Sequence, residues 1–383
     1  MITFDFLNLK MTAFGLDISD FSLKLIKLKR RAKEFDLASF GEAAIPKGIF
    51  EAGEIKDESS LIKIIRQAIS EVKGEKLKTN EVVCSLSEEK SFLRVMQLPK
   101  MGPEELEKSI CFEAENHIPI PLQEAYFGYE VIEPLVDHLD HCDILVAAAP
   151  RKIIDGYARV LRAVGLAPIA FETESLSISR ALVNNWLTVN PILLIDLGAT
   201  KTTLMIFSGR SLKFITILPI SSVQLTQALA SGLGVTMEEA EQIKISYGLG
   251  NKTKVQITGK SVDNGFGKEI LEDRKVYDIL SLALSDMVSE IKNLLDFYYS
   301  HASHEHLPPG RLEVKRILLS GGGANLIGLD KFLSKELSVS VSLGNPWVNI
   351  LSDPYNRVPE NYLYKSMAYT NVLGLSLRGI LGE

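Results

Sequence analysis

Two stretches of the chain place an acidic residue at the end of a short apolar run and follow it with small polar residues. In residues 191–207, PILLIDLGATKTTLMIF, the apolar run stops at Asp196 and apolar residues resume at Leu204. This pattern predicts a strand, a tight turn and a second strand. A turn of small residues lets backbone N–H groups approach an anion, and a carboxylate at the end of a buried strand can orient a metal ion through water. Alone, the stretch fits an ordinary hairpin equally well.

The same shape occurs near the start of the chain. In residues 14–28, FGLDISDFSLKLIKL, the apolar run reaches Asp17 and is followed by the small polar residues Ser19, Asp20 and Ser22. Two such hairpins suggest a duplicated unit in which both turns face one ligand. Turns of this composition suit a phosphate group.

A glycine-rich turn forms a third signal. The segment SGGGANLIGL, residues 320–329, follows a predicted buried strand at 314–319 and precedes a predicted helix at 326–337. Consecutive glycines let the backbone pass flat against a ligand and place a helix N-terminus beside it. Such a turn is costly unless something requires the close approach.

Two pairs of charged residues lie at predicted helix positions. Glu172 and Glu174 stand at the start of a predicted helix, where favourable charge at the positive helix end explains them as well as a site does. Glu241 and Lys244 share a helix face at i, i+3, and such pairs are usually surface ion pairs. The histidine-rich segment 301–306 has no cysteine or acidic cluster with the spacing of a metal site, and it is predicted to be a loop.

Length and composition restrict the class of protein. At 383 residues the chain is expected to form at least two domains. Hydrophobic content of 46% and charged content of 23% are ordinary, and no apolar run approaches the roughly 18 residues that span a bilayer. No signal-peptide pattern occurs, so a cytosolic location is expected. The net charge of -6 argues against nucleic-acid binding, and three scattered cysteines fit reduced thiols.

The remaining pattern separates the two hairpins by an insertion. Helices are predicted at 57–72, with Asp57 as N-cap, and from Pro103 to the turn HIPIP, where the prolines end it. Strands and a further helix, ending at Gly165, complete a helix-and-strand unit at about 88–167. The longest helix is predicted at 276–299.

The order of these signals resembles the nucleotide-binding segments of the actin, Hsp70 and hexokinase superfamily. Within it, the chain resembles the PilM family of type IV pilus assembly proteins, which is related to FtsA. The resemblance rests on FGLDISDFSLKLIKL, LPKMGPEELEKSICFEAENHIPIPLQEAYFGYEVI, IDLGATKTTLMIF with LTQAL and MEEAEQIKISYG, and ILLSGGGANLIGLDKFL. The sequence departs from the pattern at Ser19, a common glycine position, and at Ser221 and Ser222, where Gly-Gly often occurs. These residues make the backbone less permissive.

The resemblance implies an α/β fold of actin type, with duplicated ribonuclease-H-like domains and an inserted SHS2-like subdomain of the FtsA and PilM kind. It implies four subdomains: residues 1–87, 168–187 and 365–383 as subdomain 1A; 88–167 as the inserted subdomain 1C; 188–235 and 276–364 as subdomain 2A; and 236–275 as the small subdomain 2B.

The resemblance also implies that ATP and Mg²⁺ bind between the two halves. Asp17 and Asp196 would orient hydrated Mg²⁺, and Glu174 would lie near the γ-phosphate as the catalytic candidate of, at most, a slow Mg²⁺-dependent ATPase. Glu241 and Lys244 would meet the ribose or base. The nucleotide-binding residues implied are Asp17, Ser19, Asp20, Phe21, Ser22, Asp196, Gly198, Ala199, Thr200, Lys201, Glu241, Lys244, Gly321, Gly322, Gly323, Ala324 and Asn325.

The implied partner is the N-terminal cytoplasmic peptide of a PilN-like inner-membrane protein, held in a groove between subdomains 1A and 1C. The turn at 114–122 is predicted to line that groove, because Pro119 and Pro121 hold it extended, although its apolar residues could instead fill the core of the insertion. Other pilus platform proteins are expected partners, and self-association is compatible with the family. We expect no nucleic acid, no direct membrane insertion and a position at the inner face of the cytoplasmic membrane.

Three other functions fit the sequence less well. A sugar or acetate kinase would need an acceptor site with a catalytic Asp, which the insertion lacks. An FtsA-like division filament would usually add a C-terminal amphipathic helix, and the sequence ends at LGLSLRGILGE. A nucleotide-free platform subunit of a type II secretion system would not need two Asp hairpins.

Overall fold

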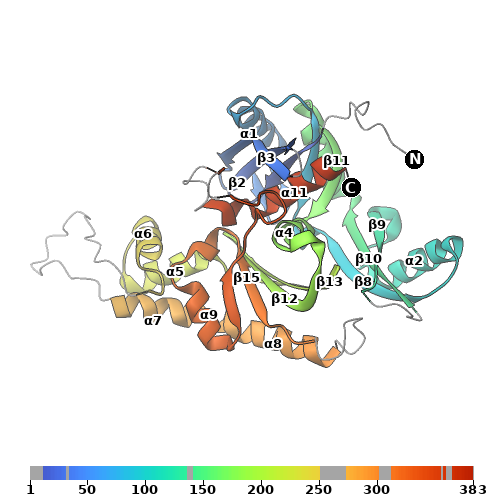
Figure 1. The fold of residues 1–383 in the computed structure, drawn as a ribbon. Coiled ribbons are helices and arrows are strands. Elements are labelled where there is room, and N and C mark those ends of the chain that lie inside the picture. The colour runs from blue at the N-terminus through green and yellow to red at the C-terminus, as the bar shows by residue number, and fades with distance from the viewer. Residues whose placement is uncertain are drawn as a thin grey trace, which may run out of the picture.

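Two sheets that share one five-strand order, with β6 added at the edge of the first, form the two halves of the molecule (Figure 1). The computed structural model describes residues 12–31, 34–135, 141–250, 273–301, 312–354, 357–358 and 365–382. The first sheet runs in the order β11 (Ala167–Thr173), β7 (Glu81–Leu86), β1 (Phe14–Ile18), β2 (Ser22–Arg31), β3 (Glu34–Ala44) and β6 (Lys73–Gly74). The second runs β14 (Ser211–Leu218), β13 (Thr202–Gly209), β12 (Thr188–Leu197), β15 (Arg316–Ser320) and β16 (Ser340–Leu343).

The two sheets are duplicates in their pairing. β1 pairs antiparallel with β2 and parallel with β7, while β12 pairs antiparallel with β13 and parallel with β15. In each half a three-strand meander is therefore extended by parallel strands on the side of its first strand. The predicted α/β class with duplicated actin-like domains is confirmed.

Helices cover both faces of each sheet, which explains why β1 and β12 are apolar runs rather than alternating strands. The first sheet packs against α1 (Glu58–Ser70) and α3 (Arg151–Ala163) on one face and α11 (Thr370–Leu381) on the other. α4 (Glu174–Leu182) contacts α11 and also packs on the second sheet. The opposite face of that sheet shares one core with α5 (Ser222–Leu233), α6 (Met237–Tyr247), α7 (Asp273–Ala283), α8 (Ser285–His301) and α9 (Leu329–Leu337).

The insertion forms a third, smaller unit at one side of the molecule (Figure 1). Its sheet has the order β8 (Phe92–Pro99), β10 (His141–Pro150) and β9 (Ala125–Ile132), and α2 (Pro103–His117) closes a core around Met96, Ile110 and Ile144. α3, which the predicted insertion includes, packs with the first sheet through Tyr157 and Leu161. The division into four subdomains stays a prediction. A short hairpin, β4 (Phe50–Glu51) and β5 (Glu54–Ile55), lies beside the first sheet's core.

Three sequence expectations on secondary structure were wrong. The single helix predicted at 276–299 is two helices that meet at Leu284, because α7 packs on α5 and α6 while α8 packs on α9. The helix predicted from 326 begins at Leu329, after a 3₁₀ turn at Gly322–Asn325. Glu172 lies in β11 rather than at a helix start. Among the helices that the structure describes, none is long and apolar enough to cross a membrane.

Candidate functional site

The β1–β2 hairpin holds Asp17 at the end of the first strand. Asp17 is 5% exposed and lies opposite Lys24. The turn closes through a hydrogen bond of 2.9 Å from Ser19 N to Ser22 O. The Ser19 hydroxyl also donates to Ser22 O at 2.9 Å, so Ser19 tightens a turn where glycine is common in the family resemblance.

The β12–β13 hairpin repeats this geometry in the second half. Asp196 lies opposite Thr203, which is the same offset as in the first hairpin. Gly198 N donates to Lys201 O at 2.9 Å and closes the equivalent turn. The two predicted hairpins therefore have the same register at the aspartate and the same backbone hydrogen bond across the turn.

Each aspartate also lies beside a serine from the neighbouring parallel strand. Ser85, at the end of β7, donates its hydroxyl to Asp17 Oδ1 at 3.0 Å, and Asn371 of α11 donates Nδ2 to the same oxygen at 2.8 Å. Asp196 lies opposite Ser320 of β15. The sequence prediction missed Ser85, Ser320 and Asn371. A serine near the end of β7 and one at the end of β15, the strands parallel to β1 and β12, were the available signal.

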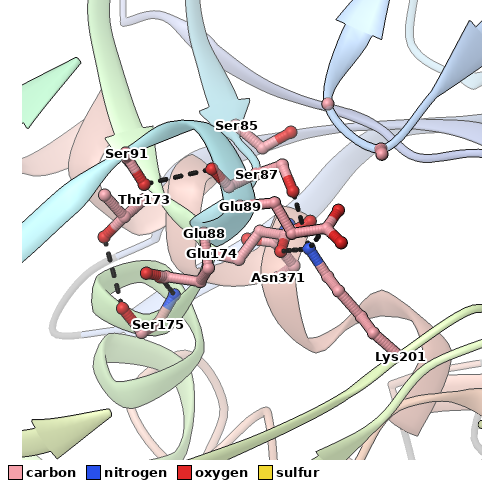
Figure 2. Close-up of polar contacts among 12 residues, drawn as sticks. Ser85, Ser87, Glu88, Glu89, Ser91, Thr173, Glu174, Ser175, Lys201 and Asn371 are labelled. Carbon is pink, nitrogen blue, oxygen red and sulfur yellow. Dashed lines mark hydrogen bonds and ion pairs between the residues drawn. The ribbon is translucent and has the colours of Figure 1, made fainter. Parts of the chain in front are cut away.

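Glu174 and Lys201 meet between the two halves (Figure 2). Lys201 Nζ lies 2.8 Å from Glu174 Oε2 and donates to Ser87 Oγ at 2.6 Å. Burial raises the pKa of Glu174, and the nearby Lys201 charge opposes that rise. Burial, together with the charge of Glu174, raises the pKa of Asp196 to about 6, and the charge of Asp17 adds to the rise. The two predicted metal-orienting carboxylates and the predicted catalytic carboxylate are therefore close enough to interact.

Asp196 should make the protein without nucleotide less stable at neutral pH. Its folded pKa of about 6 exceeds the ordinary value of 3.8, so ionisation of Asp196 lowers the free energy of unfolding. This loss of stability is absent below about pH 4 and complete above about pH 6. Asp196→Asn should raise the free energy of unfolding by roughly 1–2 kcal/mol at pH 7.5, after allowance for partial exposure, and change it little near pH 4. Urea denaturation in EDTA at both pH values measures this difference. Equal stabilities at pH 7.5 would contradict it.

The turns contain backbone donors that suit a phosphate. Within the described ranges, the N–H groups of Asp20, Phe21, Ala199 and Thr200 have no hydrogen-bond acceptor. The Asp20 carboxylate, in contrast, accepts a hydrogen bond from Ala52 N at 2.9 Å. Such unpaired turn amides are the groups that bind anions in other proteins.

The second turn is fixed to the start of α5. The carbonyls of Gly198 and Ala199 accept hydrogen bonds from Ser222 N at 3.0 Å and Val223 N at 3.1 Å. The Ser221 hydroxyl caps the helix by accepting from the N–H of the third residue after it. The serine pair that replaces the common Gly-Gly therefore has a structural use here.

The glycine-rich turn lies against the end of β12. A Cβ on Gly321 would lie 2.4 Å from Leu197 O, and one on Gly323 would lie 2.5 Å from the Leu197 side chain. The glycines at these two positions are therefore explained by packing of the protein on itself. Gly322 has open space, because a Cβ there would lie 3.8 Å from the nearest atom, Ala368 Cβ. Ala324 is buried, and Asn325 Nδ2 donates to Gly322 O.

The ion pair between Lys244 and Glu241 lies only partly at the surface, because the Lys244 side chain is buried. It is 6% exposed, and its ammonium donates to Ser222 O at 3.0 Å, to Ser222 Oγ at 2.7 Å and to Thr226 Oγ1 at 2.8 Å. Glu241 pairs with it at 2.7 Å and has a 46% exposed side chain. Lys244 therefore holds α6 against α5, and Glu241 is the member of the pair that faces solvent.

Two other acidic residues near Glu174 have structural partners. Glu172, 3% exposed, pairs with Arg180 at 2.6 Å and Arg378 at 3.3 Å, away from the hairpins. Glu88, whose pKa is raised by burial, accepts a hydrogen bond from Ser175 N at 2.7 Å and so caps α4. No local pattern in the sequence marks Glu88, because its partner Ser175 is distant along the chain.

The donor set fits a hydrated divalent ion rather than a directly coordinated one. In the parts of the chain that the structure describes, no three His, Cys, Asp or Glu side chains are placed to hold a metal ion. Two carboxylates beside phosphate-binding turns suit Mg²⁺, which keeps several waters in protein sites. Of the histidine-rich segment, His301 ends α8 and stacks on Phe297, and the other histidines lie outside the described residues.

A large groove lies elsewhere, between the insertion and the first half. Its volume is about 1290 Å³, and its lining runs from β9 to β11, which are the terminal strands of their sheets among the described residues. Apolar residues of β10 and α3 also line it, including Ala147 and Ile154, and Glu130, Asp155 and Arg162 add charge. Neither Asp17 nor Asp196 lines this groove.

The turn at 114–122 does not line this groove, which corrects the sequence prediction. Ile118 is 6% exposed and packs in the core of the insertion, with Ile120 and Leu122 against it. The prolines thus direct these side chains inward, as the alternative interpretation expected.

Comparison with known protein families assigns the chain. Residues 15–259, more than half of the chain, match the family described as "Type IV pilus assembly protein PilM". The chain belongs to the PilM family. Residues 193–374 also match the family described as "Cell division protein FtsA". In agreement, cell division protein FtsA of Pseudomonas aeruginosa is 24% identical over 202 residues, which are 49% of this chain and 42% of that protein.

Solved structures show the same fold. The "PilM-PilN type IV pilus biogenesis complex" contains a chain 25% identical to this one, with a TM-score of 0.77 and coverage of 97% of this chain and 99% of that one. MreB5 of Spiroplasma citri bound to ADP is 12% identical, with a TM-score of 0.55 and coverage of 96% of both chains. The latter likeness concerns the fold alone.

Proposed function

We propose that this PilM-family protein is an ATP-binding scaffold of a type IV pilus assembly platform at the inner face of the cytoplasmic membrane, and that it recruits the N-terminal peptide of a PilN-like protein. The observation that carries the nucleotide part is the duplicated hairpin, in which Asp17 and Asp196 end matching strands and unpaired turn amides follow. Any turnover is slow at most, with Glu174 as the candidate that positions the attacking water.

The roles follow from the positions of the side chains. Asp17, oriented by Ser85 and Asn371, and Asp196, beside Ser320, hold the waters of Mg²⁺. The turn amides bind phosphate oxygens. Bound Mg²⁺ supplies the positive charge that lets carboxylates and phosphates share one site.

The partner part rests on the groove. Among the residues that the structure describes, β9 and β11 have no strand paired on one side, and an extended peptide can pair with the backbone N–H and C=O groups there as an added strand. The apolar lining offers space for its side chains. The structural likeness to the chain in the PilM-PilN complex, over nearly the whole length of both, supports a PilN-like partner.

Titration calorimetry with ATP tests the nucleotide site. The parent protein should bind ATP about 10–100-fold more tightly with Mg²⁺ than without it, because outer-shell carboxylates contribute on this scale to metal affinity. Asp196→Ala should abolish the Mg²⁺ dependence. Equal ATP affinity for both proteins, with and without Mg²⁺, would refute the assignment.

A further inference from the structure

Lys201 is a cation of one half whose partners all belong to the other half. Its backbone lies in the β12–β13 turn, and its ammonium contacts Glu174 Oε2 at 2.8 Å, Ser87 Oγ at 2.6 Å and Glu89 Oε2 at 3.9 Å (Figure 2). The side chain is 17% exposed. Glu174 and Ser87 lie within hydrogen-bond distance of the ammonium, and Glu89 adds a longer ionic contact, so Lys201 joins the two halves at a partly buried point.

The partners of Lys201 mark the place where the chain enters the insertion. Ser87 and Glu89 belong to residues 87–91, the link between β7 of the first sheet and β8 of the insertion. Glu88 of this link caps α4, and Lys90 pairs with Glu54 at 2.6 Å. The link is therefore held by the first half on one side and by Lys201 on the other.

The insertion is also attached to the second half at a separate point. Lys213 of β14 pairs with the buried Asp143 of β10 at 2.8 Å, and Leu93 of β8 packs near Phe207. The insertion thus bridges both halves, and it forms one wall of the groove. A change at the link can therefore alter the groove.

We propose that Lys201 is a nucleotide-released latch, which holds the second half against the link 87–91 until phosphate takes over its ammonium. This inference rests on the proposed ATP site and adds its regulation. The Lys201 ammonium extends from the turn whose amides would bind phosphate, so a triphosphate competes directly with Glu174 and Glu89 for it. Loss of this contact leaves the insertion attached to the second half at Lys213–Asp143, so the insertion can shift relative to β11 and change access to the groove.

Hydrogen exchange of the link tests the latch. Without nucleotide, Lys201→Met should speed exchange of amides in residues 87–92 about tenfold, because a hydrogen-bonded ionic contact is lost. Saturating ATP with Mg²⁺ should speed exchange of the same amides in the parent to the same extent. It should cause no further change in the exchange rates of Lys201→Met. Lys201→Arg should behave as the parent, and Lys90→Met, which removes an ammonium that pairs within the first half, should still respond to ATP.

The outcomes separate this inference from the proposed function. Identical exchange of the parent and a folded Lys201→Met would overturn the latch, as would an unchanged link in parent protein shown by calorimetry to be saturated. Absence of ATP binding to the parent would overturn the proposed function and the release step together. The nucleotide-free comparison would then still decide whether Lys201 holds the link.

Discussion

Gly374→Ala is expected to destabilise the protein by at least about 3 kcal/mol. Gly374 lies in α11 where this helix crosses α4, and a Cβ there would lie 1.8 Å from Ser177 O. Real Cβ contacts do not fall below about 3.0 Å, so the two helices must separate. Since both helices pack in the cores between the sheets, separation loses buried contacts as well. Urea and thermal unfolding followed by circular dichroism measure the loss.

The same substitution should weaken the proposed nucleotide site. α11 carries Asn371, which orients Asp17, and α4 begins with Glu174. Any separation of the helices moves these groups apart, so ATP affinity should fall together with stability. Calorimetry on the folded fraction of the variant measures this effect.

Gly156→Ala is the matched control. Gly156 also lies within a helix, α3, but the nearest atom to an added Cβ is 3.9 Å away and belongs to the flexible Arg159 side chain. Alanine should therefore stabilise the protein by about 0.5–1 kcal/mol through helix propensity. If both variants changed the free energy of unfolding in the same direction, the close approach of α11 to α4 would not be the reason for glycine at position 374.

The hairpins were predictable because their signals are local. An apolar run that ends in Asp and small residues defines a strand and a turn within a few residues, and the repetition at Asp17 and Asp196 defines the duplication. The roles of Glu172 and Glu174 were not separable in this way. β11 continues to Thr173 because it pairs with β7, and this pairing decides which carboxylate reaches Lys201.

Residues that support the site from distant segments could not be predicted. Asn371 and Glu88 are ordinary polar residues in sequence, and only the packing of α11 and of the link 87–91 gives them partners. The burial of Lys244 could not be predicted either. A Glu–Lys pair at i, i+3 has the same sequence pattern whether it lies on the surface or packs against another helix, as this one packs against α5. Ile118 was misplaced because an extended turn does not reveal which side faces the core.

Gly128→Trp should weaken binding of the partner peptide more than tenfold without loss of stability. Gly128 lies in β9 opposite Ala147, lines the groove, and has no atom within 4 Å of an added Cβ. An indole there occupies space that an extended peptide would need, and it suits a strand better than glycine does. Peptide affinity itself should be micromolar at best, since the segment loses conformational freedom on binding.

Gly102→Trp gives the matched control for the groove. Gly102 precedes α2, also has open space around an added Cβ, and does not line the groove. Fluorescence titration of a labelled N-terminal peptide of the PilN-like protein from the same genome should show parental affinity for Gly102→Trp and weakened affinity for Gly128→Trp. Equal weakening in both variants would indicate a nonspecific effect of the added indole. Parental binding by Gly128→Trp would mean that the peptide binds outside the part of the groove that Gly128 lines.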